Sequence, residues 1–154
     1  MNGKTVPMAQ LTPLLEEILR QGGRVEMTAT GRSMEPLLHD RESQVRLGPP
    51  RPLQRGDIAL YRRDSGGYVL HRVTAAGERY TCCGDAQWAQ ERDIRPDQIV
   101  AVAEAFTVRG RWVSVGALRH GVYWHIWLAL RPVRRLVIGG SRRIRRLLAH
   151  GGGA

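Results

Sequence analysis

Glycine and proline clusters interrupt the chain at short intervals between residues 22 and 115, and this punctuation limits the length of any regular element there. The prolines within residues 48–52 remove hydrogen-bond donors and fix φ, so that segment cannot belong to a continuous strand or helix. The other turn clusters are Gly22-Gly23, Gly56-Asp57, Gly66-Gly67, Gly77-Glu78 and Gly84-Asp85. Only short elements fit between them, which favours a mainly β domain built as a coiled sheet or a barrel.

The segments between these turns have the composition and alternation of strands. We expect strands at residues 24–30, 45–47, 58–62, 68–74, 79–83, 99–108 and 112–115. Helices are expected only near the two ends of the chain. Residues 11–21 carry leucine and isoleucine at the i, i+3, i+4 spacing of an amphipathic helix, and Gly22-Gly23 would end it.

The charge is divided unevenly along the 154 residues. Residues 1–104 contain 14 basic and 14 acidic side chains, whereas residues 105–154 contain ten arginines and no acid, so the whole net charge of +10 lies in the last third. A basic protein often binds nucleic acid, but here a neutral part is followed by a cationic one. We therefore predict two units: a β domain with its N-terminal helix (residues 1–115) and a basic, aromatic, helical tail (residues 116–154).

The tail begins with the apolar, aromatic segment 121–130. Ten helical residues at about 1.5 Å each cannot cross a hydrocarbon core of about 30 Å. Extension back to Val113 brings in Arg119 and His120, which are costly within lipid. From Val133 onward, apolar residues at helical spacing alternate with arginines, as in helices that lie on anionic membranes. The sequence favours that interpretation over a helix packed on the domain or on a partner, and over a membrane span.

Two further features concern the compartment and metals. The N-terminus has neither a long apolar core nor a cleavage-site pattern, so we predict no signal peptide and a cytoplasmic or peripherally membrane-associated protein. Cys82 and Cys83 are adjacent, which provides neither a disulfide framework nor the spacing of metal ligands.

Three polar residues combine into a candidate catalytic set. Ser33 follows Gly31 at the end of an expected strand and precedes Pro36, which places its hydroxyl on bent, exposed backbone. A serine needs a general base to attack at neutral pH, and His71 in the strand 68–74 is such a base. Asp85, after the strand-breaking Gly84, is a candidate to support the imidazole.

Each of these residues has an ordinary structural explanation when it is taken alone: a turn serine, a strand histidine and a turn aspartate. His39 is a rival base that lies nearer to Ser33 in the sequence. Backbone amides of residues 31–34 could form an oxyanion hole, because a glycine lets a substrate carbonyl approach closely. We therefore count four residues as candidates for substrate binding: Gly31, Arg32, Met34 and Pro36.

As a set, four motifs within about residues 27–105 resemble those of the type I signal peptidase superfamily. They are Ser33-Met34-x-Pro36, Arg55-Gly56-Asp57-Ile58, His71-Arg72-Val73 and Gly84-Asp85. The similarity is to the archaeal and endoplasmic-reticulum branch, in which histidine replaces the lysine of the usual bacterial enzymes. The resemblance implies a signal-peptidase-like β fold with Ser33 as nucleophile, His71 as general base and Asp85 as supporting acid. It also implies an extended peptide substrate and no metal or organic cofactor.

These features predict a serine endopeptidase that cleaves a peptide or leader precursor, with activity falling as the pH drops through the ordinary pKa of histidine, about 6.5. One alternative is a nucleic-acid-binding or regulatory protein that uses the arginine tail and carries a peptidase-like domain. Another is a peptide-binding member without catalysis.

Overall fold

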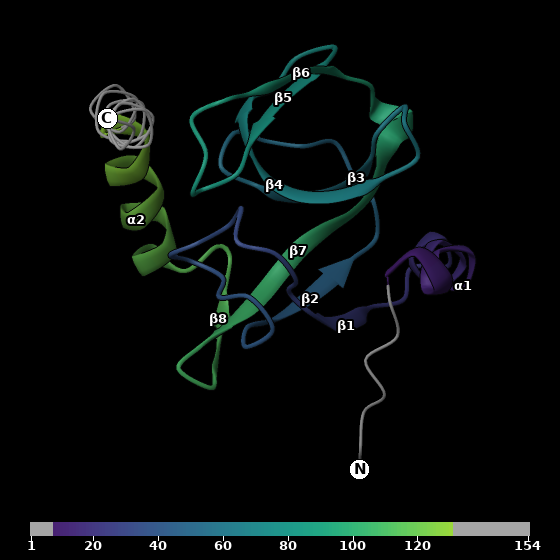
Figure 1. Ribbon diagram of the computed structural model, residues 1–154, viewed down its shortest axis with the longest axis horizontal. Coiled ribbons are helices and arrows are strands. Elements are labelled where there is room, and N and C mark those ends of the chain that lie inside the picture. Colours follow the sequence, from purple (N-terminus) through teal and green to yellow (C-terminus); the bar gives the residue numbers. More distant parts are fainter. Residues whose placement is uncertain (1–7, 131–154) are drawn as a thin grey trace, which may run out of the picture.

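The computed structural model describes residues 8–130, which form one eight-stranded antiparallel sheet with a helix near each end (Figure 1). The helices are α1 (Met8–Arg20) and α2 (Leu118–Ala129), and a 3-10 turn (Pro96–Gln98) precedes β7. The strands are β1 (Val25–Thr28), β2 (Gln44–Gly48), β3 (Ile58–Arg62), β4 (Tyr68–Ala75), β5 (Tyr80–Cys83), β6 (Glu91–Ile94), β7 (Ile99–Val108) and β8 (Arg111–Ser114).

The strands are arranged in the order β1-β2-β7-β3-β4-β5-β6, and β8 pairs with the C-terminal part of β7, residues 105–108. The prediction of a mainly β chain is thus confirmed. Of the two expected forms, coiled sheet or barrel, the described strands do not close into a barrel, because no pairing joins β1 to β6. In Figure 1, the long β7 runs through the middle of the molecule, with α1 beside β1 and α2 at the opposite side.

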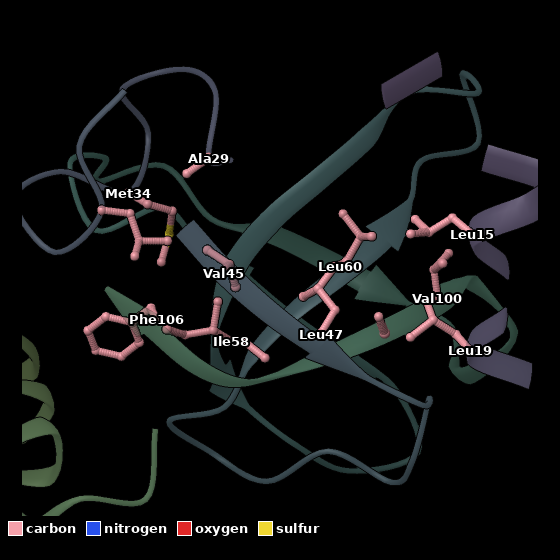
Figure 2. Close-up of a cluster of buried hydrophobic side chains, with 13 residues drawn as sticks. Leu15, Leu19, Ala29, Met34, Val45, Leu47, Ile58, Leu60, Val100 and Phe106 are labelled. Carbon is pink, nitrogen blue, oxygen red and sulfur yellow. The ribbon is translucent and has the colours of Figure 1, made fainter. Parts of the chain in front are cut away.

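Strand β3 is buried on both faces, which explains its nearly uninterrupted apolar sequence. Ile58 and Leu60 point into one core, whereas Ala59 and Tyr61 point into a second. The first core, shown in Figure 2, joins α1 and the turn after β1 to the sheet. Its buried members are Leu15, Leu19, Ala29, Met34, Leu38, Val45, Leu47, Ile58, Leu60, Val100, Ala101, Ala103 and Phe106.

The second core lies between β3, β4, β5, β6 and the start of β7. Its buried members are Leu53, Ala59, Tyr61, Val73, Tyr80, Cys82, Ile94, Ile99 and Val102. Cys83 points away from this core and packs instead against Trp124 and Trp127 of α2. Both cysteines are buried, and their opposite orientation follows from the alternation of side chains along β5.

Helix α2 packs on the sheet through its aromatic residues. Trp124 and Trp127 stack with ring centroids 5.9 Å apart, and the Trp127 indole N–H donates to the carbonyl oxygen of Asp85 at 2.9 Å. No helix within residues 8–130 has the length and apolar character needed to cross a membrane. The helix expected from Val133 onward lies outside the described residues.

Candidate active site

Ser33 lies in a tight turn that follows β1. Gly31 opens the turn with a φ of +87°, a conformation that glycine adopts without steric cost, and its amide donates to Oδ1 of Asp40 at 2.8 Å. Met34 is buried in the first core, and its carbonyl oxygen accepts hydrogen bonds from the amides of Leu37 and Leu38, both at 3.0 Å. The neighbours of Ser33 are therefore fixed, while Ser33 itself stays half-buried.

The segment Gly84-Asp85-Ala86 packs closely against this turn. The amide of Ala86 donates to the carbonyl oxygen of Ser33 at 2.8 Å. A Cβ at Gly84 would lie 2.4 Å from that same oxygen and 3.1 Å from the Ser33 Cβ, so only glycine fits without a shift of backbone. The Gly84-Asp85 motif thus positions the backbone of Ser33, a contact that sequence reasoning did not foresee.

His71 lies opposite Ala59 in the β3–β4 pair and is almost fully buried. Its Nδ1 lies 3.2 Å from the Tyr61 hydroxyl and 3.6 Å from Oε1 of Glu91. The second distance is that of an electrostatic contact and exceeds a hydrogen bond. An ionised carboxylate can only accept hydrogen bonds, so Glu91 favours the tautomer with hydrogen on Nδ1. The other nitrogen, Nε2, has no hydrogen-bond partner within residues 8–130 and is not sealed from solvent.

The surroundings of His71 keep the imidazole neutral. Burial lowers the pKa of His71 from 6.5 to about 4, and the negative charge of Glu91 opposes this only in part. Glu91 itself stays ionised, because hydrogen bonds from Arg63 lower the pKa of its carboxyl group. At neutral pH the site therefore combines an uncharged imidazole with a charged Glu91–Arg63 pair.

The structure places the carboxylate of Asp85 against Arg72, the residue after His71. Oδ1 and Oδ2 accept from Nε and Nη2 of Arg72, both at 2.8 Å, in a two-pronged ion pair that is fully buried. Nδ1 of His71 is instead contacted by Tyr61 and Glu91. The role of Asp85 as the acid that supports the imidazole stays a prediction. Its negative charge does favour the protonated form of His71, as a smaller contribution than that of Glu91.

Ser33 and His71 line one cavity of about 300 Å³ that lies between the turn after β1 and the edge of β4. No hydrogen bond joins the two side chains in this structure. The remaining lining residues are Met27, Ala29, Thr30, Gly31, Met34, Leu38, Arg63, Tyr68, Val69, Leu70 and Gln87. Two of the four predicted substrate-binding residues, Gly31 and Met34, are therefore present at the cavity.

The other two predicted substrate-binding residues, Arg32 and Pro36, are exposed and do not line this cavity. Arg32 lies 3.9 Å from the carboxylate of Glu35 on the surface. The rival base, His39, is exposed and is likewise not part of the cavity lining. The geometry thus brings His71 to the cavity of Ser33 across 38 residues of sequence, and it does not bring His39 there.

Strand β4 has an open edge beside the cavity. Its pairing with β5 begins at Arg72, so within residues 8–130 Tyr68–His71 are paired on the β3 side only. The amide and carbonyl of Val73 both hydrogen-bond toward β3, to Asp57 and Gly56. Because backbone groups alternate along a strand, those of Tyr68 and Leu70 point to the open edge. This edge can accept an added strand.

Three functional groups of the site escaped sequence reasoning: Tyr61, Arg63 and Glu91. Glu91 opens β6, whose charged sequence Glu-Arg-Asp gives no alternation to identify a strand. No three His, Cys, Asp or Glu side chains gather to hold a metal ion in the described part of the chain.

Comparisons with known proteins give no relative for this chain: no family model, no curated protein and no solved structure matches it.

Proposed function

We propose that this protein is a serine endopeptidase of signal-peptidase-like fold that cleaves an extended peptide or leader precursor, with Ser33 as nucleophile and His71 as general base. The observation that carries the proposal is the shared cavity: a serine hydroxyl without a hydrogen-bond partner in the described chain and a buried, neutral imidazole line the same 300 Å³ space. The motifs that resemble the Ser/His signal peptidases contribute both residues.

The proposed reaction follows from the tautomer of His71. With hydrogen on Nδ1, directed toward Tyr61 and Glu91, the lone pair of Nε2 can take the proton of Ser33 as its oxygen attacks the scissile carbonyl. The imidazolium then gives that proton to the scissile nitrogen as the peptide C–N bond breaks and the amine leaves. Water attacks the resulting acyl-serine ester: His71 takes one proton from the water and gives it to the Ser33 oxygen as the ester C–O bond breaks, which releases the carboxylic acid. The ionised Glu91 stabilises the imidazolium in both steps.

The open edge of β4 supports an extended peptide as the substrate. A peptide that pairs with the outward backbone groups of Tyr68 and Leu70 would pass along the cavity that contains Ser33 and His71. Ala29 and Met34 are buried apolar residues at the cavity wall, so this space favours an uncharged side chain next to the cut.

The test is cleavage of an unbiased peptide library by the parent protein and by three variants, with products identified by mass spectrometry. We expect cleavage by the parent, loss of the same products in Ser33→Ala and in His71→Ala, and unchanged products in the control His39→Ala. Cleavage that persists in Ser33→Ala would refute the proposal. Peptides that bind but are not cut by the parent would identify a binding-only protein.

A further inference from the structure

Helix α2 has two different faces. One face carries Tyr123, Trp124 and Trp127, which pack against Cys83 and the buried Arg72. Trp124 also contacts Arg55 and closes over Gly56, where a Cβ would lie 3.0 Å from its Nε1. These contacts fix how the helix is rotated on the sheet.

The opposite face of α2 is apolar and exposed. Val122 and Ile126 lie on α2, and Leu130 follows its last residue, with its amide still bonded to the carbonyl oxygen of Ile126 at 3.0 Å. The spacing of four residues therefore places the three side chains in one row. Their exposed fractions are 50%, 55% and 50%, and no other part of the described chain covers them. His125 and Ala129 are exposed on the same side. Three large aliphatic side chains in one row form a contiguous apolar surface, in contrast to the single exposed apolar residues that are ordinary on proteins.

The sequence on both sides of this row carries charge of one sign. Residues 105–154 contain ten arginines and no acidic residue, and seven of these arginines follow Leu130 directly in the sequence. Those seven lie outside residues 8–130, and their contribution here is their charge alone. An apolar row continued by an arginine-rich segment matches the two requirements of binding to an anionic bilayer: buried apolar area and attraction to the headgroups.

We infer that α2 is a peripheral membrane helix: its tryptophan face is docked on the sheet, and its Val122-Ile126-Leu130 face lies on an anionic lipid surface. A nucleic acid would use the arginines but would leave the apolar row exposed, so the lipid surface accounts for both features. The inference is independent of catalysis by Ser33. It implies that the cavity is held at a membrane surface through the contact of Trp127 with Asp85.

The experiment is sedimentation of the full chain with vesicles of phosphatidylcholine, alone or mixed with phosphatidylglycerol. We expect binding to the anionic vesicles and little to the neutral ones. The variant Val122→Ser/Ile126→Ser/Leu130→Ser should bind anionic vesicles about tenfold to a hundredfold more weakly, because the apolar area is lost while the arginines remain. The control Leu14→Ser/Ile18→Ser, which removes exposed apolar residues of α1, should bind as the parent does.

Two measurements keep the test decisive. The first is near-ultraviolet circular dichroism of the stacked Trp124 and Trp127, which shows whether α2 stays docked in the triple variant. The second is vesicle binding by Ser33→Ala, which should equal that of the parent whether or not the peptidase proposal holds. Absence of binding to anionic vesicles, or equal binding by a triple variant that keeps its docked spectrum, would overturn the inference. Binding of duplex DNA without binding of vesicles would overturn it in favour of a nucleic-acid partner.

Discussion

Gly84 lies against Ser33 so closely that a Cβ at position 84 would sit 2.4 Å from the Ser33 carbonyl oxygen. The next two residues extend this contact: Asp85 binds Arg72 beside His71, and the amide of Ala86 binds the Ser33 carbonyl. A single three-residue segment thus connects the turn of the proposed nucleophile to the strand of the proposed base. The relative position of Ser33 and His71 depends on it.

The first prediction concerns Gly84→Ala. The added methyl group must displace the backbone of Ser33, and we expect a loss of about 1–3 kcal/mol in the free energy of unfolding. Peptide cleavage should fall by about a hundredfold at a temperature where the variant is fully folded, because small displacements of a nucleophile are costly. Chemical denaturation and cleavage assays measure the two effects. Gly67→Ala is the control, since a Cβ there meets nothing within 4 Å; equal effects at both positions would contradict the prediction.

The second prediction concerns Glu91→Gln. The amide keeps the shape of the side chain but removes the negative charge that stabilises protonated His71. We expect cleavage to fall by about tenfold or more, because protonated His71 loses its counterion. The free energy of unfolding should change little, because Glu91 begins β6 and is only half-buried. Steady-state kinetics should place the loss in kcat and not in KM. Glu42→Gln, at an exposed position outside the cavity, should leave kinetics unchanged. A Glu91→Gln enzyme with full activity would remove Glu91 from the mechanism.

The third prediction concerns Asp85→Asn. This change leaves the buried charge of Arg72 opposite a neutral amide, and we expect a loss of about 3–5 kcal/mol in the free energy of unfolding. Replacing both partners, as in Arg72→Met/Asp85→Leu, should restore part of this stability, because no unpaired charge remains. Urea denaturation followed by tryptophan fluorescence measures both variants. A double variant with a lower free energy of unfolding than Asp85→Asn would contradict this prediction. It would show that the two side chains stabilise the fold by more than neutralising each other's charge.

The fourth prediction is the pH dependence of cleavage. His71 must be neutral to accept a proton, and burial lowers its pKa to about 4. We expect kcat/KM to stay flat between about pH 8 and 5 and to fall only as the pH drops through about 4. The expectation from the sequence, a fall near pH 6.5, used the ordinary pKa of an exposed histidine and omitted burial.

The same pKa shift affects folding. Between pH 6.5 and 4 the unfolded chain binds a proton at His71 that the folded chain excludes, so the free energy of unfolding decreases as the pH falls through this window. Circular dichroism at each pH therefore has to accompany the kinetics. A midpoint of cleavage near pH 6.5 in protein that remains folded would contradict a buried His71.

The sequence predicted most of the fold, because turns leave a strong local signal. The glycine and proline clusters bound β3, β4 and β5 closely, and the apolar run of β7 was recognised at its observed limits. β6 was missed because its charged residues pair with β5 through backbone groups, which composition does not reveal. The helix expected at residues 11–21 is observed at Met8–Arg20.

The candidate site was predicted only in part, because the sequence reveals residue types and motifs but not the contacts between strands. Ser33 and His71 could be selected by residue type and motif, and the fold brings them to one cavity. The neighbours of the imidazole come from two other strands: Tyr61 lies on β3 two residues from the partner of His71, and Glu91 reaches it from β6. The register of the β3–β4 hairpin depends on the conformation of its turn. The approach of Glu91 depends on how β6 is placed in three dimensions, which no local spacing encodes. Gly84 was selected as a strand breaker, and its contact with Ser33 became visible only in three dimensions.

The central claim is that Ser33 and His71 act as one unit, and a double-mutant cycle tests it most directly. The measurement is kcat/KM on one peptide from the library for the parent, Ser33→Ala, His71→Ala and the double variant. We predict a loss of at least about a thousandfold in each single variant and no further loss in the double variant, since either change disables the same step. Losses that multiply in the double variant, or a single variant that keeps its activity, would contradict the account.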